Sequence, residues 1–340
     1  MGVKVLGVEF APLSVPWERR LQTAAVAQWV FVLFEAPFIL VALAVYMFFY
    51  TSYWWLVAFY AAWLYYDRDA PATGGYRPVM RSWPVWHYFR DYFPITLTKT
   101  ADLDPQHNYI FACHPHGIIS YGVFCSLGTT AAHFDQLFPG IKRHLLTLRS
   151  NFYWPIRREY FLFMGGCDVS KESIRYLMTR ADRGHAAVIV VGGAEEALDA
   201  HPGRYELTIK KRKGFIKQAL IHGAHLVPVF TFGENDLYSQ LDNERGTVVR
   251  RVQTKFKDVL GFSPPIFHGR GIFNYTFGTL PYRKAVETVV GAPIPVQKIE
   301  QPTTEEINNL HKRYMVELHL LFEQHKQNHG VHEDVKLHMY

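Results

Sequence analysis

The chain has 340 residues, of which 49% are hydrophobic and 19% are charged, so it can bury a large core and is neither a disordered polymer nor a collagen-like rod. Its net charge of +6 suits an anionic membrane surface or a phosphorylated ligand as well as nucleic acid, and does not choose among them. The three cysteines, Cys113, Cys125 and Cys167, form no CxxC pair. Such an odd, scattered set argues against a disulfide framework and favours a reducing compartment.

A long apolar segment lies near the N-terminus. From residue 24 to residue 66, 38 of 43 residues are apolar or aromatic, and Glu35 is the only charged one. A bilayer core needs about 20 apolar helical residues per span, so the segment holds one long span or two spans closed by a turn at Thr51 and Ser52. Basic residues flank both ends, which favours both flanks on the cytoplasmic face and therefore a hairpin.

We therefore predict a cytosolic segment over 1–23 and a retained membrane hairpin over 24–66. The alternative is a buried hairpin in a soluble helical core, although such helices rarely stay apolar on every face. An ionised carboxylate at the centre of a span costs about 2.5 to 3.5 kcal/mol. Glu35 thus either sits shallow in the membrane or has a role.

The rest of the chain has the pattern of a folded α/β domain over 67–330, followed by a frayed tail over 331–340. Short β-branched or aromatic runs predict buried strands at 109–112, 188–191, 226–230 and 288–290. Three helices have clear end signals: 171–183 capped by Ser170, 214–222 ended by Gly223, and a last helix running from a capping box of Thr303 and Glu306 to Gly330.

The first predicted strand ends in a histidine turn, Cys113-His114-Pro115-His116-Gly117. Open α/β sheets bind ligands beyond the carboxyl ends of their strands, and a glycine permits close backbone approach to a substrate. An imidazole with a pKa near 6.5 is suited to removing a proton from an alcohol that attacks an acyl carbon. The alternatives are a pair of structural histidines, or a zinc site that includes Cys113 but lacks a clear third and fourth ligand.

Two further strands end in turns that contain glycine and glutamate. Gly192 and Gly193 lead into Glu195 and Glu196, which can lie at a helix N-terminus, where the helix dipole favours carboxylates. Simple helix capping explains that pattern equally well. The strand at 226–230 leads to a second Gly-Glu pair, which places Glu234 at a neighbouring strand end.

A basic run lies before that last strand. Five of the eight residues over 210–217 are Lys or Arg, and Gly214 begins a predicted helix among them. Such a run is usually a solvated face, but beside a glycine and a helix start it can also hold phosphates.

Together these segments resemble the acyl-CoA:diacylglycerol acyltransferase type-two family, which includes the monoacylglycerol and wax-alcohol acyltransferases. The matching motifs occur in family order over nearly the whole chain: Tyr92-Phe93-Pro94, the His-Pro-His-Gly turn, Gly-Gly-Ala-Glu-Glu-Ala-Leu, and Arg212-Lys213-Gly214-Phe215 running through Leu226-Val227-Pro228-Val229 to Phe232-Gly233-Glu234. The segments at 8–13, 17–23 and 267–271 are most similar to the monoacylglycerol acyltransferase branch.

The resemblance implies a glycerolipid-acyltransferase-like mixed sheet flanked by helices, in a multi-pass protein of the endoplasmic reticulum membrane whose catalytic domain faces the cytosol. It implies acyl transfer from fatty acyl-CoA, bound as a substrate, to 2-monoacylglycerol. Diacylglycerol or a long-chain alcohol as the acceptor stays open, as does a homo-oligomeric state. We expect no cofactor, no metal and no nucleic-acid partner.

The resemblance also implies the roles of particular residues. We predict His116 as the general base with His114 as the alternate, and Glu196 or Glu234 as the charged partner. The wider glycerolipid acyltransferases carry H-x-x-x-x-D, but the fifth position after each histidine is Ile119 or Tyr121 here. Tyr121 could accept a hydrogen bond from an imidazole, which favours His116. The predicted substrate-binding residues are Gly117, Gly192, Gly193, Lys211, Arg212, Lys213, Gly214 and Phe215.

Two hypotheses from other classes compete with this one. A catalytically silent lipid-binding protein would need the hairpin and an apolar groove but no histidine. A metal-dependent ester hydrolase would use water as the acyl acceptor and would be inhibited by chelators.

Overall fold

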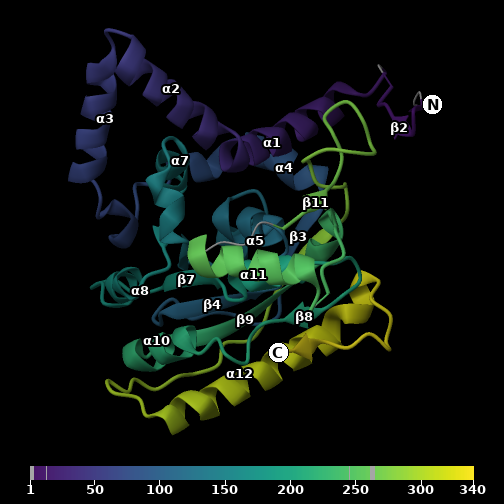
Figure 1. The fold of residues 1–340 in the computed structure, drawn as a ribbon. Helices are drawn as coiled ribbons and strands as arrows, with labels where there is room; N and C mark the ends of the chain where they lie inside the picture. Colours follow the sequence, from purple (N-terminus) through teal and green to yellow (C-terminus); the bar gives the residue numbers. More distant parts are fainter. Residues whose placement is uncertain (1–3, 13, 245, 261–264) are drawn as a thin grey trace.

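A seven-stranded sheet forms the centre of the protein in the computed structural model, which describes residues 4–12, 14–244, 246–260 and 265–340 (Figure 1). Its strand order is β3-β12-β9-β4-β7-β5-β6, and every neighbouring pair is parallel except β12 and β9. The strands are β3 (Ile95–Lys99), β4 (Tyr109–His114), β5 (Lys142–Thr147), β6 (Cys167–Asp168), β7 (His185–Val190), β9 (His225–Phe232) and β12 (Val286–Val290). The mixed α/β fold expected from the sequence is confirmed.

The four predicted strands are β4, β7, β9 and β12, and they lie side by side in the sheet. They are nearly continuous apolar runs because both of their faces are covered. The sequence analysis missed β3, β5 and β6. These strands are short or carry partly exposed polar residues, so they lack that apolar pattern.

Helices cover both faces of the sheet. On one face, α8 (Lys171–Met178), α10 (Gly214–His222) and α12 (Thr304–His325) build one part of the core. On the other face lie α5 (Tyr121–Val123), a π-helical turn (Phe124–Gly128) and α6 (Phe134–Leu137). Besides the N-terminal helices, the domain contains α4 (Val85–Tyr92), α7 (Arg157–Phe163), α9 (Gly193–Leu198), α11 (Val248–Leu260), β1 (Lys4–Val5), β2 (Val8–Glu9), β8 (Glu206–Leu207), β10 (Ser239–Gln240), β11 (Phe267–His268) and β13 (His338–Met339).

Side chains alternate between the two faces along β4. Ile110 and Ala112 belong to the core beneath α10 and α12, whereas Phe111 and Cys113 belong to the core on the opposite face. Because the side-chain period of a strand is two, the last residue, His114, points toward α12.

The predicted starts of the three helices are confirmed, and so is the end of α10. The Ser170 hydroxyl accepts the Ser173 N–H at the start of α8, and the capping box of Thr303 and Glu306 opens α12. Gly223 ends α10 with a left-handed φ of +64°, which glycine adopts at little cost. The predicted ends of two helices were too late, because α8 ends at Met178 and α12 at His325.

The prediction of a frayed tail over 331–340 is wrong. In this segment β13 pairs in parallel with β8, and Val331 and Leu337 are buried in the core beneath α12. Apolar residues at intervals in the tail match the core face that they cover, so the tail belongs to the domain.

The first helix of the predicted hairpin, α1 (Trp17–Phe34), packs on the domain rather than standing apart from it. Ala25, Val26 and Trp29 are buried in a cluster with residues of α4 and α7. The ring of Trp29 stacks on Phe124 with centroids 3.7 Å apart. The folded domain therefore includes residues 24–34 of the predicted hairpin, because an apolar helix face is satisfied by a protein core as well as by lipid.

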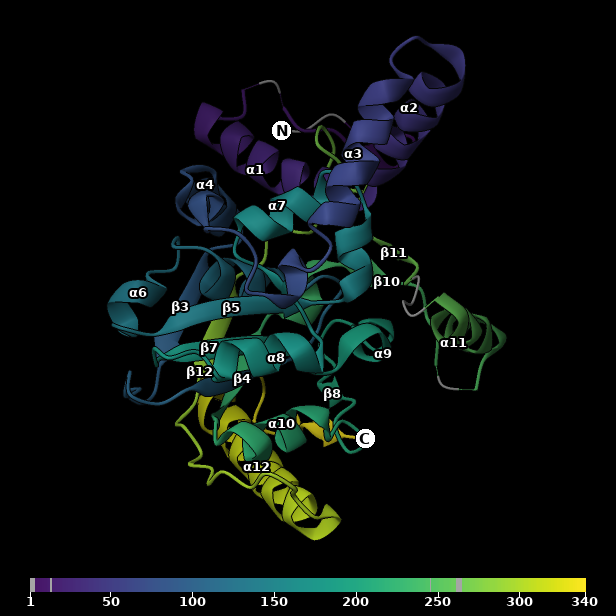
Figure 2. The same ribbon diagram turned by 90° about the vertical axis from the view of Figure 1, so that its left-hand side faces the viewer.

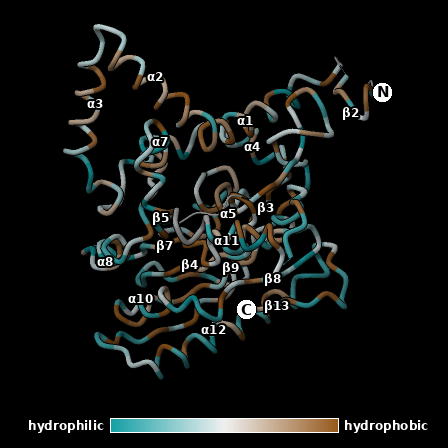
Figure 3. The backbone as a smooth tube through the Cα atoms, viewed as in Figure 1, coloured by the Kyte–Doolittle hydropathy of each residue, from teal (hydrophilic) through white to brown (hydrophobic). Residues whose placement is uncertain are grey.

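The next two helices, α2 (Ala36–Tyr50) and α3 (Trp54–Tyr66), project away from the sheet as an antiparallel pair (Figures 1 and 2). They turn at Thr51 and Ser52, as the polar pair in the sequence indicated. Large apolar side chains are exposed along both helices, including Phe49 and Phe59, and hydrophobic residues recur along α2 in Figure 3. Within the described ranges no helix alone is long and apolar enough to cross a membrane, and only α1 and α2 together meet that test, across a bend of 53°.

Candidate functional site

Three predicted turns meet at one edge of the sheet. The histidine turn follows β4, the turn beginning at Gly192 follows β7, and the turn containing Glu234 follows β9. Because β7, β4 and β9 are adjacent and parallel, their carboxyl ends lie next to one another. The sheet thus brings together the histidines and the carboxylates that the sequence analysis selected.

Glu196 joins the histidine turn to the segment that follows β8. Its Oε2 accepts the main-chain N–H of His116 at 2.9 Å, and its Oε1 accepts the N–H of Thr208 at 2.9 Å. The carboxylate is buried against Gly192, where a Cβ atom would lie 1.9 Å from Glu196 Cδ. Glycine is therefore required at position 192 by the carboxylate beside it.

His114 is fully buried, and both of its ring nitrogens face protein groups. Nδ1 lies 3.7 Å from Glu196 Oε1, and Nε2 lies 3.2 Å from the hydroxyl of Tyr314 on α12. The Tyr314 hydroxyl donates its own proton to the carbonyl of Ala112 at 3.0 Å. Its oxygen therefore accepts from Nε2–H of His114, which fixes the ring within the core.

His116 is partly buried, and among the described residues one of its two ring nitrogens takes part in a hydrogen bond. Nδ1 lies 3.0 Å from the carbonyl oxygen of Gly117, and since a carbonyl only accepts, Nδ1 carries the proton. The lone pair of the neutral ring is then on Nε2, because the hydrogen bond of the ring among the described residues is made through Nδ1. Burial lowers the pKa of His116, while the Gly117 carbonyl and the charge of Glu196 oppose this effect. The ring is thus neutral at pH 7, as a general base must be.

Glu234 contacts neither histidine through a hydrogen bond or ion pair in the described part of the chain. Its two oxygens accept the N–H groups of Tyr121 and Gly122, each at 2.8 Å, at the start of α5. Burial raises the pKa of Glu234 to about 7, and these two donors oppose the rise. Gly117 lies against it, with a φ of +57° and space for no Cβ, which would come within 2.5 Å of Glu234 Cγ. The prediction that Glu234 orients an imidazole is wrong, because both of its carboxylate oxygens accept main-chain N–H groups instead.

The expected hydrogen bond between Tyr121 and an imidazole is also absent from the described residues. The Tyr121 hydroxyl is bonded to that of Tyr238, which donates to the carbonyl of Thr279 at 3.0 Å. Both tyrosines are buried beside α4 and β11, away from the histidine rings.

The basic loop, which we define as residues 210–213, leads into α10 beside the turn that follows β7. Arg212 donates to the Gly192 carbonyl at 3.3 Å and forms an ion pair of 3.6 Å with Glu195. Lys213 donates to Asn308 on α12 at 2.7 Å, and Lys211 is exposed. The loop therefore presents positive charge next to the histidine turn.

Three of the predicted substrate-binding residues differ in their surroundings. Gly193 has a φ of +61° and begins α9, and Gly214 begins α10; a Cβ atom at either would meet open space. Phe215, by contrast, is buried edge-to-face against Tyr314, with ring centroids 5.1 Å apart. Phe215 therefore packs beneath the histidine turn, and its role in substrate binding stays a prediction.

The zinc alternative does not fit the geometry. Cys113 points to the face of the sheet opposite His114, and burial raises the pKa of its thiol. No three His, Cys, Asp or Glu side chains in the described ranges lie where they could together hold a metal ion.

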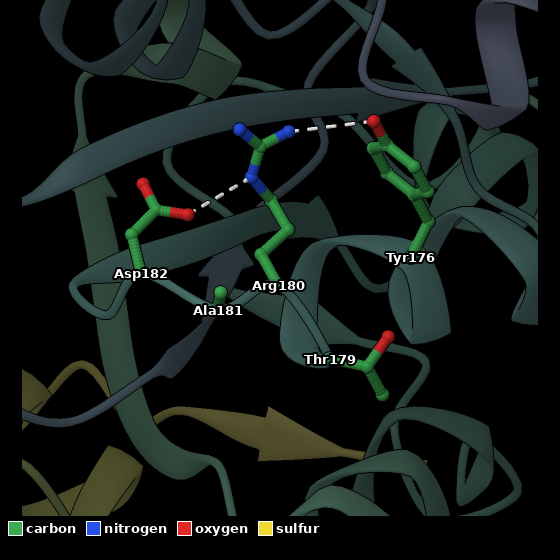
Figure 4. A pocket seen from close by; sticks show the side chains of 5 residues that line it. All are labelled: Tyr176, Thr179, Arg180, Ala181 and Asp182. Atoms are coloured by element: carbon green, nitrogen blue, oxygen red, sulfur yellow. Dashed lines mark hydrogen bonds and ion pairs between the residues drawn. The ribbon is translucent and has the colours of Figure 1, made fainter.

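A surface pocket at the end of α8 lies apart from these turns (Figure 4). It is lined by residues 176 and 179–182, and its Arg180 donates to Asp182 at 3.2 Å and to Tyr176 at 3.4 Å. None of the predicted site residues contributes to it.

Sequence reasoning missed Tyr314 and Thr208 as partners of the histidine turn. Tyr314 appeared only as one of the apolar positions of the last helix, 200 residues from His114 in the chain. A tyrosine within an apolar stripe can signal a buried hydroxyl that needs a partner. Thr208 acts through its main-chain N–H, so its residue type carried no signal.

Known proteins are similar to this chain over most of its length. Residues 46–340 match the family described as Diacylglycerol acyltransferase. A 2-acylglycerol O-acyltransferase 1 from Bos taurus is 50% identical over 333 residues, covering 97% of this chain and 98% of that protein. A Diacylglycerol O-acyltransferase 2 from Dictyostelium discoideum is 48% identical, covering 94% of this chain and 96% of its own length.

A solved structure gives a much weaker likeness. The 1-acyl-sn-glycerophosphate acyltransferase of Thermotoga maritima is 11% identical and covers 90% of this chain and 94% of its own, at a TM-score of 0.38, which is too low to support an argument. The family match and the near-complete coverage of the relatives agree with the three turns at the sheet edge: the chain belongs to the diacylglycerol acyltransferase family.

Proposed function

We propose that this protein transfers a fatty acyl group from acyl-CoA to a hydroxyl of 2-monoacylglycerol, which yields diacylglycerol and free coenzyme A. Its family and its relatives named 2-acylglycerol O-acyltransferase support an O-acyltransferase, and the name of the relative at 50% identity supports this acceptor. The observation that carries the chemistry is His116, whose Nδ1 is held by the Gly117 carbonyl while Nε2 keeps its lone pair.

In the proposed reaction, Nε2 of His116 takes the proton of the acceptor hydroxyl as the hydroxyl oxygen attacks the thioester carbon. The carbon–sulfur bond then breaks, and the coenzyme A thiolate recovers the proton from the imidazolium. A neutral imidazole is needed at the start, and burial lowers the pKa of His116 in that direction. Glu196 acts on this ring through the main chain, by accepting the His116 N–H.

We assign the coenzyme A end of the donor to the basic loop. Lys211 is exposed, and Arg212 reaches the Gly192 carbonyl beside the histidine turn, so positive charge lies close to the reacting groups. Phosphates of the donor would be attracted to this loop, with a strength that depends on ionic strength.

We assign membrane attachment to α2 and α3, in an endoplasmic reticulum protein whose catalytic domain faces the cytosol. The support is their exposed apolar surface, which a soluble protein rarely presents over so large an area. Alkaline carbonate should leave the protein in the membrane pellet, whereas deleting residues 36–66 should release it. Release of the intact chain by carbonate would contradict the assignment.

The acceptor is tested by incubating membranes that carry this chain with labelled oleoyl-CoA and an equal choice of 2-monoacylglycerol, diacylglycerol and a long-chain alcohol. Diacylglycerol should be the first labelled product. Labelled triacylglycerol without prior diacylglycerol, or a labelled wax ester, would instead support the second candidate, which the Diacylglycerol O-acyltransferase 2 relatives favour.

A further inference from the structure

The C-terminal strand reaches the site from the far end of the chain. The N–H of His338 donates to the carbonyl of Tyr205 at 2.9 Å, and the N–H of Tyr340 donates to that of Leu207 at 2.8 Å. These bonds pair β13 with β8 in parallel, and the C-terminus lies beside β8 in Figures 1 and 2. Buried Leu337 anchors the strand in the core, while the His338 side chain is exposed.

Tyr340 also fixes the first residue of the basic loop. Its main-chain carbonyl accepts the N–H of Ile209 at 3.0 Å and that of Lys210 at 2.7 Å. The preceding N–H, of Thr208, donates to Glu196. Three consecutive N–H groups are therefore held by two acceptors, one on the C-terminal strand and one beneath the histidine turn.

This arrangement connects β13 both to the histidine turn and to the basic loop. Glu196 connects Thr208 to the His116 N–H, so the segment 208–210 is tied on one side to the histidine turn. On the other side it continues into the basic loop, where Arg212 donates its N–H back to the Ile209 carbonyl at 2.8 Å. Exposed lysine side chains are flexible, so the direction in which they point depends on the main chain that carries them.

We propose that β13 is a positioning element of the acyl-CoA site: by pairing with β8 and accepting from Ile209 and Lys210, residues 338–340 hold the basic loop in register with the histidine turn. This inference rests on the proposed function, since it assumes that the loop binds the phosphates of acyl-CoA. Residues 338–340 touch no substrate in this account. Their loss should weaken donor binding without changing the chemical step.

The test removes one hydrogen bond of the strand. Both variants below lack the exposed His338 side chain, so they differ in the main-chain N–H. His338→Pro removes the N–H that donates to Tyr205, whereas the matched control His338→Ala keeps it. We expect His338→Pro to raise KM for acyl-CoA about five-fold, the effect of one net hydrogen bond, with kcat and the acceptor KM unchanged. His338→Ala should match wild type. Equal acyl-CoA KM values for the two variants, or a fall in kcat alone, would overturn the proposal.

A second measurement needs no variant and covers the case in which His338→Pro fails to fold. Hydrogen exchange of the full-length wild-type protein is followed with and without coenzyme A. The amides of Ile209, Lys210 and Tyr340 should become protected together when coenzyme A binds. Protection of the basic loop with unchanged exchange at Tyr340 would reject the coupling. Failure of the proposed function is distinct, because wild type would then form no diacylglycerol from 2-monoacylglycerol and acyl-CoA.

Discussion

The histidine turn and the basic loop lie at the same end of the sheet but are held in different ways. In the histidine turn, buried carboxylates accept main-chain N–H groups, and glycines leave room for them at positions 117 and 192. In the basic loop, the side chains of Lys210, Lys211 and Arg212 are exposed, and directly after the loop a Cβ atom at Gly214 would meet open space. The comparison suggests that the first region sets the geometry of the chemical step, while the second sets the affinity for a charged donor.

The largest effect should come from the histidine turn itself. His116→Ala removes the proposed base, and a positioned base contributes about 10² to 10⁴ in rate, so kcat should fall by that factor with little change in either KM. Steady-state kinetics of the purified protein check this, normalised to folded protein. His114→Ala should instead lower the unfolding temperature, because it removes a buried ring and leaves the Tyr314 hydroxyl without its donor. Normal kcat in both variants would reject the mechanism.

An added methyl group should destabilise the protein at Gly192 but have little effect at Gly214, which directly follows the basic loop. Gly192→Ala places a Cβ atom against the Glu196 carboxylate and should reduce the free energy of unfolding by about 1 to 3 kcal/mol, with loss of activity. Gly214→Ala is the matched control, since nothing lies within 4 Å of its Cβ position. Its stability should stay within about 1 kcal/mol of wild type. Chemical denaturation of both variants makes the comparison, and equal losses would contradict the difference in packing.

Glu234 should make the stability of the domain depend on pH. Burial raises its pKa from 4.5 to about 7, so the folded state binds the proton more tightly than the unfolded state between these values. The protonated carboxyl group stabilises the folded state at low pH, and this stabilisation is lost as the pH rises through 7. The loss in unfolding free energy is about 3 kcal/mol, since each unit of pKa shift corresponds to about 1.36 kcal/mol. The difference in unfolding free energy between wild type and Glu234→Gln should therefore change between pH 5 and pH 8. A constant difference would show that the carboxyl titrates normally.

The smallest effect should come from the basic loop. Reversing Lys211, Arg212 and Lys213 to glutamate should raise KM for acyl-CoA about ten-fold and reduce its dependence on salt, because surface charges act through a screened field. Lys217→Glu is a control for a charge reversal outside the loop, since Lys217 is exposed on α10. If KM stays unchanged in the triple variant, the loop is a solvated face, and coenzyme A binds elsewhere.

Much of the sheet and the location of the site could be predicted, because both depend on local pattern. Buried parallel strands such as β4 and β7 are continuous apolar runs, and the turns that follow them carry the histidines and glutamates. The partners of those groups could not be predicted. Whether Glu196 or Glu234 reaches a histidine depends on the direction in which each side chain leaves its turn, which the sequence pattern does not specify. Tyr314 comes from a helix 200 residues away in the chain.

The N-terminal segment illustrates a second limit of sequence reasoning. Hydropathy alone treats residues 24–66 as one unit, but the structure divides them at Glu35, where α1 ends and α2 begins. Trp29 of α1 lies in a protein core, while Phe49 of α2 is exposed. Composition alone does not distinguish a helix face in lipid from one in a protein core, because both environments favour apolar side chains.

The central claim is that His116, and not His114, accepts the proton of the acyl acceptor. The pH dependence of kcat in wild type, His116→Ala and His114→Ala tests it most directly, because a base must lose its proton to act. Since burial lowers the pKa of His116, the wild-type rate should stay level through pH 7 and fall only at a more acidic pH than an ordinary imidazole would give. We expect this acidic fall to disappear from the residual activity of His116→Ala and to persist in His114→Ala. An acidic fall that persists in His116→Ala and disappears in His114→Ala would contradict it.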